Sequence, residues 1–88
     1  MPSPETLFQR AVNKTVPRAS RKEAIDELGR LDATKQLRVI AVTGGLSGTY
    51  RRQAVEALGG CDAVEALDAV ATDRAVESTL RERAELLG

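Results

Sequence analysis

The chain has 88 residues, which is enough for one small domain. Its 13 Lys and Arg balance 13 Asp and Glu, and 42% of its residues are apolar, as in a packed protein rather than a disordered one. With no His and a single Cys, the composition excludes the usual zinc sites, a disulfide framework and a histidine base.

The first half of the chain predicts three helices, over residues 4–13, 20–31 and 33–43, because apolar residues recur there at helical spacing. Pro17 closes the segment before the second helix, and Ser20 with Glu23 has the spacing of a capping box at its start. Gly29 follows Leu28 near the end of that helix. It suits the position after a helix where a left-handed backbone favours glycine.

The second half predicts three more helices, over residues 49–58, 62–71 and 73–87. Gly59 takes the place that Gly29 has in the first half, and Asp62 with Glu65 repeats the capping-box spacing. The third and fourth helices are joined by a glycine-rich stretch, Gly44–Gly48, that is longer than a usual turn between paired helices.

Three segments of the chain resemble one another. KEAIDELG at 22–29 returns as RQAVEALG at 52–59, 30 residues later, and as RERAELLG at 81–88, after 29 more. A repeat of this length indicates that each unit is one pair of helices, and such pairs bury their apolar faces by stacking. We therefore expect an all-α fold in one domain, 1–88, with units of roughly 4–31, 32–59 and 60–88.

The residues from 51 onward follow the pattern of a known repeat: Arg52, Ala54, Leu58, Gly59, Asp62 and Asp73. In these positions the chain resembles HEAT-like repeats of the phycobilisome-lyase type. The resemblance implies a short α-solenoid, a right-handed stack of about three antiparallel helix pairs. The match is best over 51–88, and the glycine-rich stretch departs from it.

The glycine-rich stretch also admits an interpretation as a phosphate loop. Leu37–Thr43 is rich in β-branched residues, and a strand there followed by Gly44–Gly48 would resemble a nucleotide-binding turn. Tyr50 stands where the last glycine of that fingerprint belongs, no Lys-Ser/Thr pair follows, and residues 51–88 read as helix. We therefore favour a loop between helices.

Neither the thiol nor the carboxylates predict a catalytic site. Cys61 precedes a helix start, which can lower a thiol pKa, but no second Cys or His accompanies it, so we interpret it as a half-buried turn residue. The carboxylates of the last third lie at helical spacings typical of solvated faces. We expect no enzyme activity, and no catalytic, cofactor-binding or metal-binding residue.

Charge is unevenly distributed along the chain. Residues 1–52 hold ten Lys/Arg and five Asp/Glu, whereas residues 53–88 hold three and eight. Paired cations lie near the start of the second helix in the first two units, a further arginine extends the row into the third, and one more lies upstream. Together they form the candidate partner-binding set: Arg18, Arg21, Lys22, Arg51, Arg52 and Arg81. The alternative is that these charges only solubilise the starts of helices.

The predicted function is that of a small non-catalytic adaptor or scaffold for protein–protein interaction, because stacked helix pairs present one helix of each pair to partners. An acidic or amphipathic segment of a partner protein would contact the cations. The alternative is a nucleic-acid-associated protein that binds phosphates through its basic N-terminal half. The opposite charges of the two halves further predict weak head-to-tail self-association that salt reduces.

The sequence also predicts where the protein resides. Its longest uncharged run, Val39–Tyr50, has twelve residues and three glycines, too few apolar residues to span a bilayer. Met1–Glu5 lacks the basic start and apolar core of a signal peptide. A single unpaired Cys suits a reducing compartment, so we expect a cytoplasmic protein that does not enter membranes.

Overall fold

The computed structural model describes residues 2–88, and the secondary structure of these residues is six α-helices with no strand. The chain is therefore all-α, as its sequence predicts. The helices are α1 (Pro4–Val12), α2 (Arg18–Arg30), α3 (Thr34–Val42), α4 (Gly48–Gly60), α5 (Val64–Thr72) and α6 (Ser78–Leu87).

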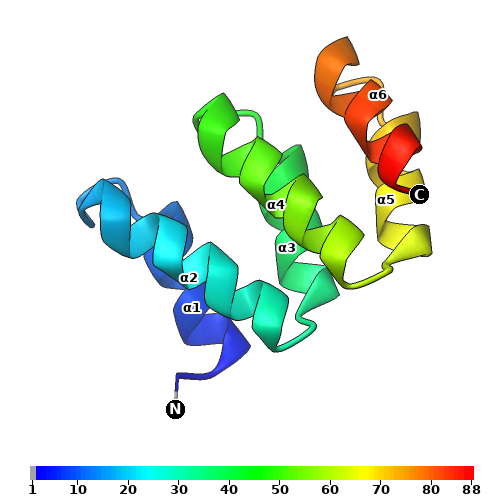
Figure 1. The fold of residues 1–88 in the computed structure, drawn as a ribbon. Coiled ribbons are helices and arrows are strands. Elements are labelled where there is room, and N and C mark those ends of the chain that lie inside the picture. The colour runs from blue at the N-terminus through cyan, green and yellow to red at the C-terminus, as the bar shows by residue number, and fades with distance from the viewer. Residues whose placement is uncertain (1) are drawn as a thin grey trace.

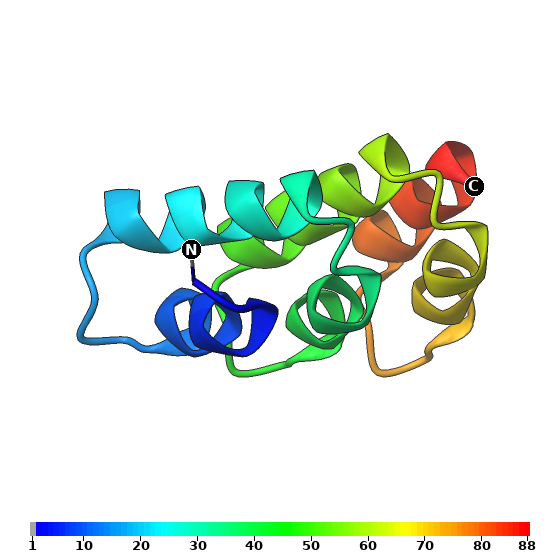
Figure 2. The ribbon, with the colours of Figure 1, turned by 90° about the horizontal axis from the view of Figure 1, so that it is seen from below.

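The helices pack as three consecutive pairs: α1 on α2, α3 on α4, and α5 on α6. The second helices α2, α4 and α6 run side by side in one layer, and the first helices α1, α3 and α5 form the other (Figures 1 and 2). Each helix thus contacts its pair mate and the equivalent helix of the neighbouring pair. The layering gives the molecule two broad faces, one for each set of helices.

The core lies between the two layers and repeats from pair to pair. Leu7, Leu37 and Leu67 occupy equivalent positions of α1, α3 and α5, and all three are fully buried. Leu28 and Leu58 are their fully buried counterparts in α2 and α4. Burying a side chain of this size contributes about 1.5–3 kcal/mol, so these leucines account for much of the packing between layers.

The ends of α2 and α4 differ from the sequence-based prediction. Both helices continue through the glycines, and no glycine among residues 2–88 has a positive φ. The left-handed positions belong to Asp32 and Asp62, each with φ of 53°. There the amide of the next residue donates to a carbonyl five residues back, as in Ala33 N–H to Leu28 O at 2.9 Å. Asp tolerates this conformation better than most side chains.

Gly29 and Gly59 serve close helix packing instead. A Cβ at Gly29 would lie 3.3 Å from the Cβ of Ala57, and a Cβ at Gly59 would lie 3.1 Å from the side chain of Leu87. Both distances are shorter than comfortable contacts between carbon atoms. The two glycines therefore let α2 approach α4, and α4 approach α6.

The starts of α2, α5 and α6 also differ from the prediction, whereas α1 begins at Pro4 as expected. Ser20 lies inside α2, which begins after Pro17, and Asp62 precedes the N-cap of α5 rather than capping it. The last helix begins at Ser78, because residues 73–77 form a turn in which the Asp73 carboxylate accepts from the amide of Ala75 at 2.9 Å.

The true period of the repeat is 30 residues throughout, since α2, α4 and α6 begin at Arg18, Gly48 and Ser78. The third copy is therefore offset by one position from the alignment that its sequence suggests. The turn between α3 and α4 covers residues 43–47 and is as long as the other two turns within pairs, while Gly48 begins α4, so the glycine-rich stretch is not an extended loop. Residues 34–42 are helical, which contradicts the interpretation of this region as a strand and phosphate loop.

Two neighbouring glycines of α4 test the close-packing role. Gly60→Ala adds a methyl group that meets no atom within 4 Å apart from the adjoining residues and backbone of its own helix, and it should stabilise the protein by about 0.5 kcal/mol through helix propensity. Gly59→Ala gains the same propensity but meets Leu87, so it should be less stable than Gly60→Ala by about 1 kcal/mol or more. Urea unfolding of both variants measures the difference. Equal stabilities would show that the Leu87 side chain moves aside for the added methyl group at no cost in free energy.

Candidate partner-binding surface

Two of the six predicted partner-binding residues join the helices of a pair. Arg21 donates from Nε to the carbonyl of Ala11 at 2.9 Å, and Arg51 donates in the same way to Ala41 at 3.3 Å. Both carbonyls lie in the last turn of a first helix, where carbonyl groups lack partners within the helix. A guanidinium at a helix C-terminus also complements the helix dipole. These arginines therefore hold each second helix on its first helix.

Arg21 makes a further contact with the next pair. Its guanidinium carbon lies 4.1 Å from the centre of the Tyr50 ring, and only 8% of Arg21 is exposed. A guanidinium stacked on an aromatic face is favourable, and more so when both groups are shielded from water. Arg21 thus connects α1, α2 and α4, which leaves it little surface for a partner.

Arg81 has the same place in the third pair. It is half-buried, and its Nε is a buried donor without a hydrogen-bond partner. Arg21, Arg51 and Arg81 are therefore equivalent by position and point into the protein. The sequence carried a signal for this set, because arginine recurs at 21, 51 and 81 with the true period of 30.

The remaining predicted residues, Arg18, Lys22 and Arg52, are exposed on the layer of second helices. Lys22 and Arg52 occupy equivalent positions of α2 and α4, and neither takes part in an ion pair among residues 2–88. They line a shallow cavity of about 240 Å³ together with Thr49, Gln53 and Glu56. The equivalent position of α6 is Glu82, so the basic surface ends at α4.

Polar contacts between neighbouring second helices border this cavity. Gln53 Nε2 donates to the carbonyl of Lys22 at 2.8 Å and to the carboxylate of Asp26 at 2.9 Å. One pair further on, Arg83 forms a bidentate ion pair with Glu56, with Nη2 to Oε1 at 2.9 Å. The hydrogen bond from Arg83 also holds the pKa of Glu56 below its ordinary value.

Sequence reasoning missed these two contacts, although a signal exists. In both, an acidic residue and the donor that binds it are 27 residues apart: Asp26 with Gln53, and Glu56 with Arg83. The contacts set the register between successive second helices, and so they fix the separation of Lys22 and Arg52.

Cys61 is placed as a structural residue rather than a reactive one. It caps the C-terminal end of α4, and its Sγ lies 3.3 Å from the carbonyl oxygen of Gly29 in α2, to which the thiol donates. Burial, aided by the nearby carboxylate of Asp32, raises the pKa of the Cys61 thiol. A helix start lowers a thiol pKa, but here burial outweighs any such effect, because Cys61 lies at the end of α4 and three residues before α5.

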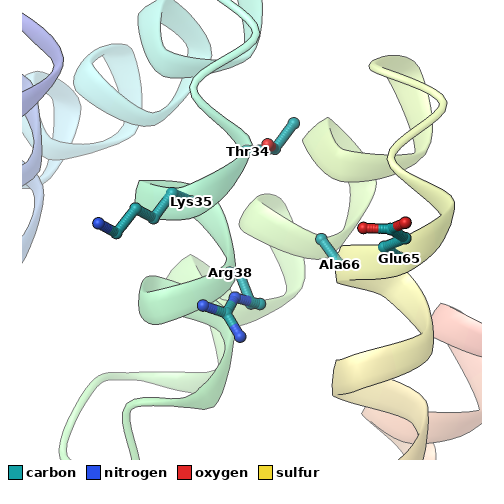
Figure 3. Close-up of a pocket in the computed structure, with 5 residues that line it drawn as sticks. All are labelled: Thr34, Lys35, Arg38, Glu65 and Ala66. Carbon is teal, nitrogen blue, oxygen red and sulfur yellow. The ribbon is translucent and has the colours of Figure 1, made fainter.

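A second surface, which sequence reasoning missed, lies between α3 and α5 on the opposite layer. One cavity of about 430 Å³ is lined by Thr34, Lys35, Arg38, Glu65 and Ala66 (Figure 3). A second of about 420 Å³ shares Arg38 and continues past Val39, Val42, Ala69, Thr72 and Asp73. The two form one groove along the helices, and Figure 3 shows that Lys35 and Arg38 do not point toward Glu65.

Comparisons of the chain with protein-family models, with curated proteins and with solved structures give no match. Within residues 2–88, no helix has the length and apolar character needed to cross a membrane. The same residues contain no group of three or more Cys, Asp or Glu side chains arranged to hold a metal ion.

Adjacent cations of α2 distinguish the inward role from the exposed one. Arg21→Ala leaves the carbonyl of Ala11 without its donor and removes a buried side chain, so it should lower the free energy of unfolding by about 1.5–3 kcal/mol. Lys22→Ala, on the exposed face, should change it by no more than about 0.5 kcal/mol. Chemical denaturation measures both. Arg21→Lys should recover only part of the loss, because an ammonium group lacks the planar guanidinium fork. Similar losses of stability at the two positions would contradict the assignment of Arg21 to the interior and Lys22 to the surface.

The Glu56–Arg83 pair should make stability depend on pH. The pKa of Glu56 is lowered in the folded protein, so its contribution is fully present above the unfolded pKa of about 4.3 and is lost as the pH falls through the folded pKa. The stability advantage of the protein over Glu56→Gln should therefore shrink below about pH 4.3. Parallel urea titrations of the two proteins from pH 7 to pH 3 test this. A constant difference would show that the pair is not stabilising.

Proposed function

We propose that this protein is a small non-catalytic module for protein–protein interaction. In this proposal it is built from HEAT-like repeats in a right-handed stack, and it binds an acidic segment of a partner protein on the layer of α2, α4 and α6. The observation that carries the proposal is the placement of Lys22 and Arg52. These two cations line one cavity from adjacent helices and have no ion-pair partner among residues 2–88.

The cavity suits side chains of a protein segment. Its volume of about 240 Å³ is small and its exposed lining is mostly apolar, with Lys22 and Arg52 contributing to its walls. Glu56 also lines it, but the carboxylate of Glu56 is paired with Arg83. A carboxylate between Lys22 and Arg52 would gain charge-assisted hydrogen bonds from both walls. Arg18 is exposed at the start of α2 and extends the positive surface toward the N-terminal end of the stack.

An acidic protein segment fits this surface better than a nucleic acid does. Binding to a phosphate backbone draws on a row of cations, because affinity grows with the number of phosphates neutralised. Here Arg21, Arg51 and Arg81 point inward, Arg83 is paired with Glu56, and Glu82 takes the next place in the row. The exposed cations of this layer are thereby reduced to a short set that matches one or two carboxylates.

The test compares two variants with the same change in net charge. A fluorescent peptide with alternating Glu and Leu is titrated with the protein, with Lys22→Glu/Arg52→Glu, and with the control Arg10→Glu/Arg74→Glu, whose two arginines are exposed elsewhere. Anisotropy should show binding by the protein and by the control, and affinity weakened by about tenfold or more in the first variant.

Two results would contradict the proposal. One is equal loss of affinity in both variants, which would indicate a general charge effect rather than a site. The other is tighter binding of a labelled RNA or DNA duplex than of the peptide, with a steep salt dependence, which would favour the nucleic-acid function. A pull-down from native lysate with and without nuclease then identifies the natural partner.

A further inference from the structure

The layer of first helices carries a separation of charge that the proposed function does not use. Helix α3 contains Lys35 and Arg38 and no acidic residue, whereas the neighbouring helix α5 contains Glu65 and Asp68 and no basic residue. The two helices lie side by side, yet no ion pair joins them within residues 2–88. Opposite charges thus face solvent on adjacent parallel ridges.

Lys35 and Glu65 lie at the same height along these ridges. They are 30 residues apart, which is the period of the repeat, and each is the second residue of its helix. Both are exposed, and both line the cavity between α3 and α5 (Figure 3). In Figure 3 the Lys35 side chain extends away from α5, and on that side it lines a further cavity with Glu5 and Phe8 of α1. Neither Lys35 nor Glu65 forms an ion pair among residues 2–88.

Such a surface is complementary to itself. A two-fold axis that runs along the groove between α3 and α5 exchanges the two ridges while keeping the height along them. It therefore lays α3 of one copy on α5 of the other, twice, as an isologous interface requires. The exposed surface of α3, with Lys35, then meets the exposed surface of α5, with Glu65, at both contacts.

We propose that two copies of this chain associate through the layer of α1, α3 and α5, with Lys35 of each copy against Glu65 of the other. Arg38, which borders both cavities of the groove, is the fifth residue of α3 and has the height of Asp68, the fifth residue of α5, so it faces Asp68 of the other copy. Apolar surface accompanies the charges, since Val39 is 37% exposed on α3 and Val42 and Ala69 line the groove.

The expected dimer is weak. Each of the two helices has nine residues, so the paired ridges cover about 13 Å by 20 Å, on the order of 300 Å² per copy. A stable interface buries about 800 Å² per partner. Association should therefore depend on charge complementarity, which salt screens, and should appear only at high protein concentration.

This arrangement differs from the head-to-tail contact that the sequence predicts, because a two-fold contact closes at a dimer and does not build chains. It is also independent of the proposed function. Arg18, Lys22 and Arg52 lie on the opposite layer and stay exposed in both copies, so either idea can fail without the other.

Sedimentation equilibrium at low salt tests the dimer with two charge reversals, Lys35→Glu and Glu65→Lys. The protein should pass from monomer to dimer as its concentration rises and return to monomer in 0.5 M NaCl. Each reversal alone should raise the dissociation constant by about tenfold or more, because like charges then face each other at both contacts. An equimolar mixture of the two variants should dimerise as the unmodified protein does, since every contact again joins opposite charges.

The matched control reverses charges on the other layer, with Lys22→Glu and Glu82→Lys. These variants carry the same changes in net charge, and each should dimerise like the unmodified protein, with no added association on mixing. The proposal is overturned if the protein stays monomeric at millimolar concentration, or if association ignores the Lys35 and Glu65 reversals and so uses another contact. It is equally overturned if their mixture fails to recover the dimer, or if the control mixture associates as strongly. Circular dichroism checks that each variant remains helical.

Discussion

The arrangement of both surfaces depends on how the second helix of each pair is held on the first. Arg21 and Arg51 donate from the fourth residue of α2 and α4 to a carbonyl in the last turn of α1 and α3. One contact satisfies an orphan carbonyl, complements the helix dipole and fixes the rotation of the second helix. Because rotation is fixed, the next residue, Lys22 or Arg52, is turned outward.

Contacts between pairs then set the spacing of what is exposed. Gly29 and Gly59 allow close approach of neighbouring second helices, while Gln53 with Asp26 and Arg83 with Glu56 hold their register. Close approach and fixed register bring equivalent positions of successive pairs side by side. The repeat has the same effect on the other layer, where Lys35 of α3 and Glu65 of α5 lie at the same position along neighbouring helices. Because equivalent positions of the repeat units lie side by side, a change of charge between units produces a pattern of charge on each of the two faces.

The fold could be predicted from the sequence because its signals are local or periodic. Leucines at 7, 37 and 67 and at 28 and 58 predict buried helix faces, and all are fully buried. Helix ends were harder to predict. A Leu-Gly pair suits the end of a helix and equally suits close packing of two helices, and only the neighbouring helix distinguishes the two. The start of α6 was missed because residues 73–77 resemble a helix in composition, while the Asp73 side chain stabilises a turn.

Composition and periodicity are properties of the chain alone, and they predict that the chain is helical, that it repeats, and that its cations gather near the starts of second helices. Which of two adjacent cations enters the protein depends instead on the packing of one helix against another. Arg21 and Lys22 differ by about 100° around the helix axis, and the choice between them depends on a carbonyl ten residues away from Arg21. The groove between α3 and α5 likewise forms only when two helix pairs pack side by side, so no local sequence pattern predicts it.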